Sequence, residues 1–498
     1  MRRVLNIFCS SFLICMCFAV SARTQGINIS LVGSHKPVQS GFGDVWGDGN
    51  LACMGVWLSA GYANGFGFGI YDISNPALPS LVSVYNYSAN TRNRFEQGVI
   101  TNQICYVGCW ASGTSWAGSG LHILSLSNPA SPVLLARITR TAPGTVTNGF
   151  DDVHTLFVER NFLYEAAHNT NTVNVKVFDI SNPSAPVYVR DIVTTNTTKV
   201  HQITVGNKGT NTILYTSGWG GNSDGNPNSF GQTDLWDVSN VGTQPAKWLG
   251  RIYSGYSSHS SWPTPDGNTL VICRETPGGD VSFYDISSIP NPSPTSTNNP
   301  TPIAVISPAR MGIEGDIPHN PVIVSNLLFI SWYQNGLQVF DITDRTKPVR
   351  IGSYDTYPGT GVTNAYAGNW GIYPKLGLNK LLVSDIYSGF FILDASAVLT
   401  ATNNYPPMLV TQPISLTATQ GLVATLPSLT TGSSIKYQWR FNNTILSGAT
   451  NATLTFNSVQ ASNSGNYFVV ASNSLGSVTS VVASLTVAVP AGSAPAVT

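Results

Sequence analysis

The stretch Ile70-Tyr71-Asp72-Ile73-Ser74-Asn75-Pro76 recurs along the chain and decides the fold. Close copies run from Ile123 to Pro129 and from Val177 to Pro183, and weaker copies begin at positions 235, 283, 339 and 392. The place of Asp72 recurs at 125, 179, 237, 285, 341 and 394, in steps of 53, 54, 58, 48, 56 and 53 residues. The 498-residue chain therefore holds seven units of about 54 residues, and such a period indicates a repeat architecture.

Each unit has the pattern of four short strands. In the sixth unit they are 320–324, 327–332, 337–342 and 349–354, each alternating or apolar and bounded by turn residues. Asp and Asn side chains of the repeat are expected to bond their own backbone in the turn after the third strand. Four-stranded units repeated radially make a β-propeller. The sequence thus predicts an all-β protein with a seven-bladed β-propeller over residues 23–400.

The last unit is one strand short. It shows strands at 371–374, 380–386 and 390–394, and then the pattern stops. Its missing strand is found at the N-terminus, where residues 29–34 resemble residues 349–354. We therefore expect the N-terminal strand, residues 28–34, to close the last blade and remove an open sheet edge.

The units resemble LVIVD-type repeats. The segment from His319 to Asp394, with Trp370 to Pro374 and residues 383–386, is similar to the end of the propeller in bacterial "choice-of-anchor B" surface proteins. The resemblance covers roughly residues 28–396. It implies a secreted propeller with interchangeable C-terminal anchors, and it implies no defined activity.

Residues 1–22 are predicted to be a secretory signal peptide. Arg2 and Arg3 precede a mainly apolar run from Ile7 to Val20, and Ala22 is suited to cleavage. The alternative, a membrane anchor, needs about 20 apolar residues, and this run is shorter. The mature chain is therefore expected to be secreted or at the cell surface, with no membrane insertion after signal cleavage.

Composition excludes two classes of protein. Lys+Arg and Asp+Glu number 24 each, so the chain lacks the basic footprint of a nucleic-acid partner. With 42% hydrophobic residues it is not a disordered protein. After signal cleavage four cysteines remain, and the sequence leaves open whether they are buried thiols or include one disulfide: Cys53, Cys105, Cys109 and Cys273.

A second domain is predicted over residues 410–489, after a linker at 401–409 and before a tail at 490–498. It resembles an immunoglobulin-like β-sandwich, with Trp439 as the core tryptophan and Tyr467 as the corner tyrosine. Val469 stands where the inter-sheet cysteine is expected, so packing alone must hold this core.

In a propeller the first strand of each blade lines the central channel, and its starting residues share one mouth. These residues are predicted to be Asp44, Glu96, His154, His201, His259, His319 and Asn369. The ends of the second strands are expected to add Trp57, Trp110, Trp219 and Trp332. A polar mouth edged with aromatic residues is typical of a ligand-binding site.

Each group has two interpretations. His154, His201, His259 and His319 either bond backbone carbonyls and channel water or, as neutral imidazoles, bind a divalent metal with Asp44 or Glu96. The tryptophans either pack the blades or stack on sugar rings. Glu275 and Asp385, which end second strands, are candidates for an acid and a base, although the sequence does not give their separation.

The sequence contains no nucleophile elbow, phosphate loop or dinucleotide fingerprint. We therefore expect an exported, non-catalytic recognition or scaffold protein that binds an extracellular glycan or protein partner through the loop-rich propeller face. The alternative is a metal-dependent hydrolase or lyase acting at the channel mouth. No cofactor other than a divalent metal is expected.

Overall fold

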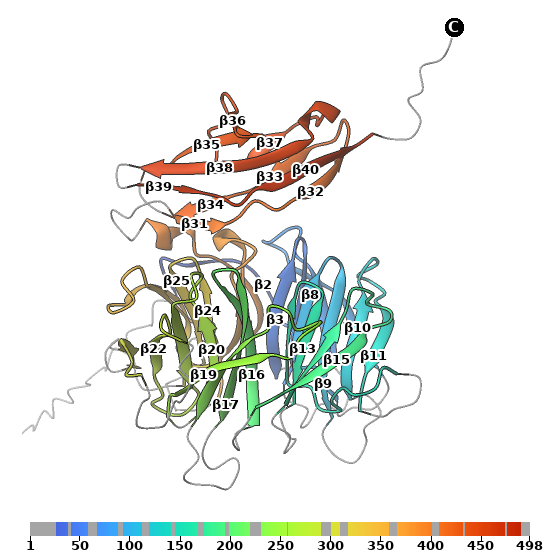
Figure 1. The fold of residues 1–498 in the computed structure, drawn as a ribbon, viewed down its shortest axis with the longest axis vertical. Coiled ribbons are helices and arrows are strands. Elements are labelled where there is room, and N and C mark those ends of the chain that lie inside the picture. Colours follow the sequence, from blue (N-terminus) through green and yellow to red (C-terminus); the bar gives the residue numbers. More distant parts are fainter. Residues whose placement is uncertain are drawn as a thin grey trace, which may run out of the picture.

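The protein is described from a computed structural model. The structure describes residues 26–37, 41–57, 67–87, 93–111, 119–140, 145–167, 174–194, 199–219, 231–255, 257–289, 300–308, 317–357, 366–400, 408–431, 434–473 and 476–489. The named elements of these residues are β-strands and short 3-10 segments, so the expected all-β class is confirmed (Figure 1). No helix among them is both long and apolar enough to cross a membrane.

The described residues between 26 and 394 form seven antiparallel sheets of four or five strands. The first four sheets follow the chain. Their strands are β3 (Phe42–Asp48), β4 (Leu51–Val56), β5 (Phe68–Asp72) and β6 (Ser80–Tyr85); β7 (Asn93–Arg94), β8 (Gly98–Thr101), β9 (Ile104–Ala111), β10 (Gly120–Ser125) and β11 (Val133–Ile138); β12 (Thr155–Glu159), β13 (Phe162–Ala166), β14 (Asn174–Asp179) and β15 (Val187–Val193); and β16 (Lys199–Lys208), β17 (Asn211–Trp219), β18 (Gln232–Asp237) and β19 (Lys247–Tyr253).

The last three sheets include the two N-terminal strands, β1 and β2. The fifth sheet consists of β20 (Ser258–Pro263), β21 (Thr269–Arg274), β22 (Val281–Asp285) and β23 (Ala304–Ile306). The sixth consists of β24 (Pro321–Val324), β25 (Leu327–Trp332), β26 (Gly336–Asp341) and β27 (Val349–Tyr354), together with β1 (Gly26–Ile27). The seventh consists of β28 (Asn369–Tyr373), β29 (Leu381–Asp385) and β30 (Gly389–Asp394), together with β2 (Ser30–His35).

The N-terminal segment joins two sheets. Strand β2 pairs antiparallel with β30, from Ser30 opposite Asp394 to His35 opposite Phe390. The sequence predicts this pairing, but it does not predict that β1 pairs with β27. Between the two strands, Ile29 is 6% exposed and packs in the core shared by these sheets.

Neighbouring sheets pack through their first strands. Strand β3 contacts β8, and contacts continue from β8 through β12, β16 and β20 to β24; β28 contacts β25 and β3. Aromatic rings from non-adjacent sheets also meet, because Phe157 on β12 lies 6.4 Å from Trp46 on β3 and 6.3 Å from Trp262 on β20. This arrangement of four-stranded sheets is consistent with a β-propeller.

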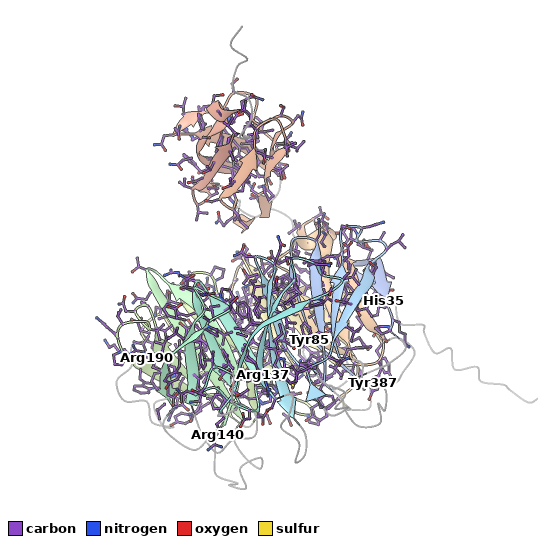
Figure 2. The ribbon with its side chains drawn as sticks, turned by 90° about the vertical axis from the view of Figure 1, so that its right-hand side faces the viewer. His35, Tyr85, Arg137, Arg140, Arg190 and Tyr387 are labelled. Atoms are coloured by element: carbon purple, nitrogen blue, oxygen red, sulfur yellow. The ribbon has the colours of Figure 1, made fainter. Side chains whose placement is uncertain are left out.

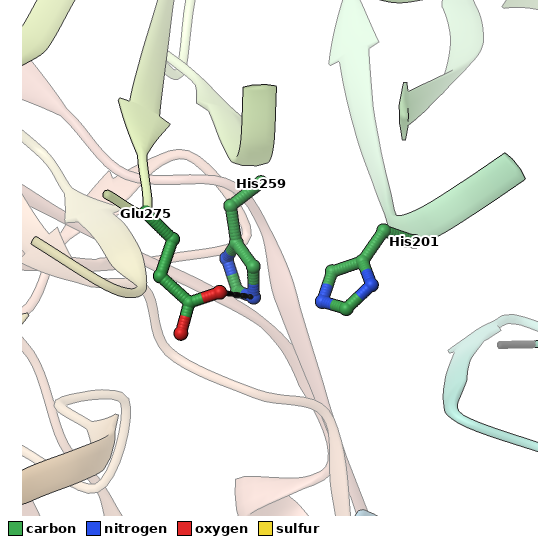
Figure 3. A group of neighbouring side chains, drawn as sticks. All are labelled: His201, His259 and Glu275. Atoms are coloured by element: carbon green, nitrogen blue, oxygen red, sulfur yellow. Dashed lines mark ion pairs between the residues drawn. The ribbon is translucent and has the colours of Figure 1, made fainter. Parts of the chain in front are cut away.

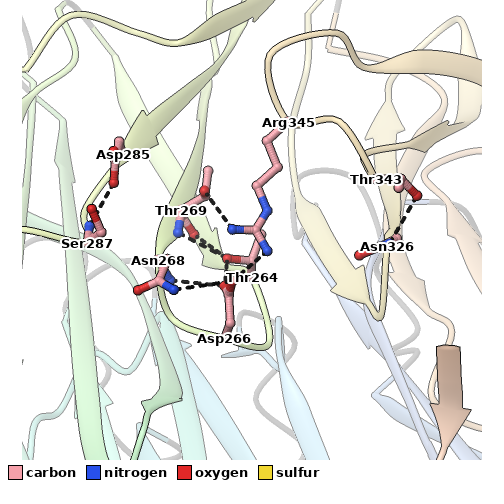
Figure 4. A network of polar contacts seen from close by, with 9 residues as sticks. All are labelled: Thr264, Asp266, Asn268, Thr269, Asp285, Ser287, Asn326, Thr343 and Arg345. Atoms are coloured by element: carbon pink, nitrogen blue, oxygen red, sulfur yellow. Dashed lines mark hydrogen bonds and ion pairs between the residues drawn. The ribbon is translucent and has the colours of Figure 1, made fainter. Parts of the chain in front are cut away.

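The repeated aspartate closes the turn after the third strand, as its position in the repeat predicts. The Ser74 amide donates to Asp72 Oδ1 at 2.8 Å, and the Ser287 amide donates to Asp285 Oδ1 at the same distance (Figure 4). Equivalent bonds form at positions 179, 237, 341 and 394. Figure 4 also shows a link between sheets, where Arg345 donates to Asp266 at 2.7 Å.

The C-terminal module, residues 408–489, has its own core. Its strands are β31 (Met408–Thr411), β32 (Leu416–Thr419), β33 (Ala424–Leu426), β34 (Leu429–Thr431), β35 (Lys436–Phe441), β36 (Thr444–Ile445), β37 (Leu454–Phe456), β38 (Gly465–Asn473), β39 (Gly476–Thr479) and β40 (Ala483–Ala488). Trp439 and Tyr467 are buried in it together with Val469. The Tyr467 hydroxyl donates to the Asn463 carbonyl at 2.7 Å, the corner bond expected of this tyrosine.

All four cysteines of the described residues are buried and carry free thiols: Cys53, Cys105, Cys109 and Cys273. Burial raises the pKa of Cys53 and of Cys273 well above the usual value, so both thiols stay protonated. Of the two alternatives left open by the sequence, this structure contains the free thiols.

Candidate functional site

β-Bulges near the beginning of three first strands position two of the four histidines and Trp370. In β16, Val200 and Gln202 pair with consecutive residues of β17, so His201 is the extra residue between them. His259 occupies the same place in β20, and Trp370 occupies it in β28. A bulged residue is released from the regular alternation of the strand, which lets its side chain turn away from the sheet.

Four imidazoles form a continuous arc across four neighbouring sheets. The ring centroids of His154 and His201 are 4.3 Å apart, those of His201 and His259 4.4 Å, and those of His259 and His319 4.5 Å. Trp370 extends the series, since its ring lies 4.4 Å from His319. The four histidines thus lie side by side, and we call them the imidazole arc.

Two carboxyl groups flank the arc. Glu96 Oε1 lies 3.3 Å from His154 Nε2 at one end. Towards the other end, Glu275 places Oε2 3.4 Å from His259 Nε2 and Oε1 3.9 Å from His319 Nε2. Glu275 directly follows β21, the strand that pairs with β20, so the hairpin brings it beside His259.

The groups around Glu275 fix its orientation. The Tyr333 hydroxyl donates to Glu275 Oε1 at 2.6 Å. His319 Nδ1 donates to the Trp370 carbonyl at 2.8 Å, so the neutral ring presents the Nε2 lone pair towards Glu275. Glu275 therefore has one oxygen bound by Tyr333 and the other directed to His259.

Burial favours the uncharged forms of Glu275 and His319 near pH 7. Burial raises the pKa of Glu275 to about 8, although the bond from Tyr333 opposes the shift. Burial also lowers the pKa of His319 to about 4, against the effect of its bond to the Trp370 carbonyl. The neutral imidazole is the form of histidine that binds metal ions.

Asp44 belongs to a separate polar network. Gln97 Nε2 donates to Asp44 Oδ2 at 3.1 Å, and Gln97 Oε1 accepts the Leu156 amide at 2.8 Å. Asn320 also hydrogen-bonds to Asp44. Burial raises the pKa of Asp44 to about 7 despite these bonds. The network ties together the first, second, third and sixth sheets near the beginning of their first strands.

Aromatic side chains continue from the arc towards solvent. The Trp57 ring lies 5.0 Å from Trp370, and the Tyr366 ring lies 5.5 Å from Tyr333. Tyr366 is 42% exposed, and Trp57 and Tyr387 are half-buried against the same cluster. Figure 2 labels Tyr387 at the edge of the sheets. We call these five residues, Trp57, Tyr333, Tyr366, Trp370 and Tyr387, the aromatic group.

The other predicted site residues have different placements. Trp332 is fully buried in the core between the fifth and sixth sheets, so its ring does not reach the expected mouth. Asn369 is also fully buried and donates to the Ser384 carbonyl at 2.8 Å, while the next residue, Trp370, extends the arc. The side chains of Trp110 and Trp219 lie outside the described part of the structure.

The carboxylate grouped with histidines in an arrangement that could hold a metal ion is Glu275, whereas the sequence predicts Asp44 or Glu96. His201, His259 and Glu275 each have a ligand atom such that all three atoms lie within 4.8 Å of one another (Figure 3). Asp385, the other candidate acid, instead accepts hydrogen bonds from Thr356 and from the Tyr387 and Ser388 amides. It therefore stabilises the turn after β29.

The sequence argument names Glu275 only as a candidate acid or base, and it does not place Trp370, Tyr333 or Gln97 in the site. Trp370 occupies the bulge position of β28 that His201 and His259 occupy in β16 and β20, so aligning the bulges rather than the strand starts identifies it. Tyr333 follows β25 and Gln97 precedes β8. No sequence pattern signals their contacts, because these contacts cross from one sheet to another.

A sequence profile of the LVIVD repeat matches residues 44–87, 152–194 and 322–356. The chain thus carries LVIVD repeats in three stretches, consistent with an LVIVD-repeat family. No curated protein matches the chain.

Solved structures similar to part of the chain include fragments of titin and tandem Ig repeats of Dlar. The titin I-band fragment I67-I69 is 29% identical over 17% of this chain and 34% of that chain, with a TM-score of 0.16. Tandem Ig repeats of Dlar are 22% identical over 17% of this chain and 49% of that chain, with a TM-score of 0.16. The trigonal form of titin M4 is 20% identical over 18% of this chain and all of the M4 chain, with a TM-score of 0.16. The chain spans about a third of the length of the first of these fragments.

Proposed function

We propose that the chain is an exported recognition protein that binds a glycan or a protein partner at the end of the sheets where the imidazole arc and the aromatic group lie. The observation that carries this proposal is that two partly exposed aromatic residues, Trp57 and Tyr366, contact buried rings beside the imidazole arc. Trp57 contacts Trp370, Tyr366 contacts Tyr333, and both buried rings contact His319. Aromatic faces beside polar groups suit sugar rings, which offer apolar faces and hydroxyl edges.

The scaffold in this proposal is a seven-bladed propeller closed by β2. The proposal is supported by the series of contacts from β3 to β24 and from β28 back to β3, and by the meeting of Trp46, Phe157 and Trp262 from three non-adjacent sheets. The C-terminal module is proposed to be an immunoglobulin-like spacer or adhesion domain, on the strength of its buried Trp439 and the corner bond of Tyr467.

Export by the N-terminal signal is part of the same proposal, as is kinship with choice-of-anchor B surface proteins. Mass spectrometry of the protein recovered outside the producing cell is expected to show a chain that begins at Arg23. A mature chain that retains residues 1–22 would contradict export by a cleaved signal.

The binding proposal is tested with an array of extracellular polysaccharide fragments, followed by calorimetric titration of each fragment that binds. Replacing Trp57 or Tyr366 with alanine is expected to weaken binding about tenfold or more, because aromatic anchors dominate such sites. The matched control is Tyr87→Ala, which removes a partly exposed tyrosine that contacts Arg137 and His122 rather than the aromatic group. The proposal is wrong if the protein binds neither glycans nor proteins and instead turns over a substrate with ordinary efficiency.

A second candidate is a metal-dependent hydrolase or lyase. The specific observation in its favour is the grouping of His201, His259 and Glu275, because two imidazoles and a carboxylate also hold the catalytic zinc of some hydrolases. It requires turnover of a bound polysaccharide by zinc-loaded protein and loss of that turnover in the Glu275→Gln variant. Turnover that is equal in the variant and the wild type would exclude it.

A further inference from the structure

The strongest unexplained feature of the molecule is the grouping of His201, His259 and Glu275 (Figure 3). All three side chains are buried, with exposures of 6%, 3% and 6%. They come from the fourth and fifth sheets, and each is held by the backbone: the two histidines by β-bulges, and Glu275 by the bond from its amide to the Ser257 carbonyl at 3.1 Å. These positions do not depend on a flexible segment.

The spacing of the ligand atoms suits one small cation. Ligands bound tetrahedrally to zinc at about 2.0–2.2 Å lie about 3.3–3.6 Å from each other. His259 Nε2 and Glu275 Oε2 are already 3.4 Å apart. The three ligand atoms all lie within 4.8 Å of one another, so a bound ion would draw them closer together by a small movement.

Outer contacts orient the ligands as they do in metal sites. Tyr333 donates to Glu275 Oε1 at 2.6 Å, which leaves Oε2 directed towards His259. In metal sites, a carboxylate that binds the metal commonly also accepts a hydrogen bond from a neighbouring group. His319 also lies beside Glu275, with its Nδ1 bonded to the Trp370 carbonyl. The Nε2 lone pair of His319 therefore faces Glu275 as a further potential metal ligand.

We propose that His201, His259 and Glu275 bind one divalent transition-metal ion of the zinc class. Two nitrogen donors and one carboxylate oxygen match Zn²⁺, whereas Ca²⁺ and Mg²⁺ prefer oxygen donors alone. The ion offsets the cost of burying the carboxylate. This site does not rest on the proposed recognition function, because it stands whether or not a glycan or protein partner binds.

The test uses the full mature chain, purified without a polyhistidine tag, stripped with a chelator, loaded with Zn²⁺ and dialysed. Elemental analysis is expected to give about one zinc per chain. X-ray absorption at the zinc edge is expected to show imidazole ligands together with oxygen. Folded wild-type protein that retains no zinc, or that holds zinc without imidazole, overturns the proposal, and neither measurement requires a variant.

Variants then locate the ion. Glu275→Gln keeps the shape of the side chain and removes its charge, and it is expected to weaken zinc binding by at least about 100-fold. Glu165→Gln is the matched control, since it makes the same change at a fully buried carboxyl on β13 and is expected to leave zinc affinity unchanged. Equal zinc affinities in the two variants would place the ion elsewhere and refute the assignment.

Two further variants test the site, and each is checked for correct folding. His201→Gln is expected to abolish stoichiometric binding, and Tyr333→Phe, at a positioning residue, is expected to weaken it about 10–100-fold. Each variant is accepted only if its near-ultraviolet circular dichroism matches that of the wild type. Zinc is also expected to raise the melting temperature of the wild type but not that of Glu275→Gln. Zinc binding without turnover upholds this site and excludes the hydrolase alternative, so the two proposals fail separately.

Discussion

Glu165 shows how burial controls the charge of a single residue. Its side chain is fully buried on β13, where Oε1 accepts the Phe150 amide at 2.8 Å. Burial raises the pKa of Glu165 from 4.5 to about 8, although the Phe150 amide and Lys176 oppose the shift. The folded protein therefore keeps a proton at neutral pH that the unfolded chain has released.

Because of this difference in protonation, we expect the wild type to lose stability as the pH rises and Glu165→Gln to avoid that loss. The contribution of the protonated group to stability is complete below about pH 4.5 and is lost as the pH rises towards 8, because the unfolded state then binds fewer protons than the folded state. Relative to wild type, Glu165→Gln should gain on the order of a few kcal/mol in the free energy of unfolding between pH 4.5 and 8. Denaturant titrations at both pH values measure this gain.

The comparison needs a carboxyl that is not buried. Glu159→Gln serves as the control, because Glu159 is partly exposed beside Arg160 and should show no comparable gain. A stability difference between Glu165→Gln and wild type that stays constant from pH 4.5 to 8 contradicts the assignment.

Tyr467 carries a second prediction at this scale. It is 1% exposed, and its hydroxyl donates to the Asn463 carbonyl at 2.7 Å. Tyr467→Phe removes the donor and leaves the carbonyl without it, which should cost about 1–2 kcal/mol of the free energy of unfolding of the C-terminal module. Denaturant unfolding of residues 408–489 gives this value. Tyr437→Phe, at a half-buried tyrosine of the same module, should stay within about 0.5 kcal/mol, and equal costs would argue against the corner bond.

At the scale of elements, adjacent sheets approach closely where the second strand has a glycine. A Cβ atom on Gly55 in β4 would overlap the Glu96 carbonyl oxygen and lie 2.6 Å from the Phe95 oxygen. Gly55→Ala should therefore destabilise the protein by about 1–3 kcal/mol, because backbone atoms of the second sheet have to move. The shift would also displace Glu96 from His154. Thermal or denaturant unfolding measures the cost.

The equivalent glycine of the next sheet provides the control. At Gly108 in β9 the nearest atoms to an added Cβ are the Val153 side chain at 3.0 Å and its carbonyl at 3.1 Å. Gly108→Ala should cost clearly less, since smaller movements relieve the contact. If Gly108→Ala is as damaging as Gly55→Ala, the close approach to Glu96 is not the cause.

Strands and turns follow from the sequence because their signals are local. Alternating apolar residues and the repeated aspartate locate β25 and β27 to the residue, and they place β26 within one residue. The turn bonds of Asp72 and Asp285 form as predicted for the same reason. Local spacing decides these features, and no contact between sheets is needed.

The candidate site is predicted only in part because it lies between sheets. The sequence predicts that the four histidines lie close together, since each is expected to begin a first strand. It does not show that Glu275, rather than Asp44 or Glu96, approaches His201 and His259, because that depends on the bulges and on how neighbouring sheets pack. Trp332 fails for a related reason: in a strand with period 2, a shift of one residue moves a side chain from the mouth to the core.

At the scale of the whole molecule, the N-terminal segment and the C-terminal module make opposite contributions. β1 pairs with β27 and β2 with β30, and Ile29 packs between them in the shared core. The C-terminal module instead buries Trp439 and its other core residues within itself. Fourteen N-terminal residues should therefore matter more to the sheets than the whole module does.

The prediction compares two truncations of the chain from residue 23 onwards. Deleting residues 23–36 removes β1 and β2, exposes the edges of β27 and β30, and should lower the melting temperature by at least about 5 °C or prevent cooperative unfolding, since several kcal/mol of strand pairing and burial are lost. Deleting residues 408–498 should leave the melting temperature of the remaining sheets within about 2 °C, because a separate domain is removed. Differential scanning calorimetry of both truncations measures the difference. Comparable melting of the two would mean that the pairing of β2 with β30 contributes little to holding the sheets together.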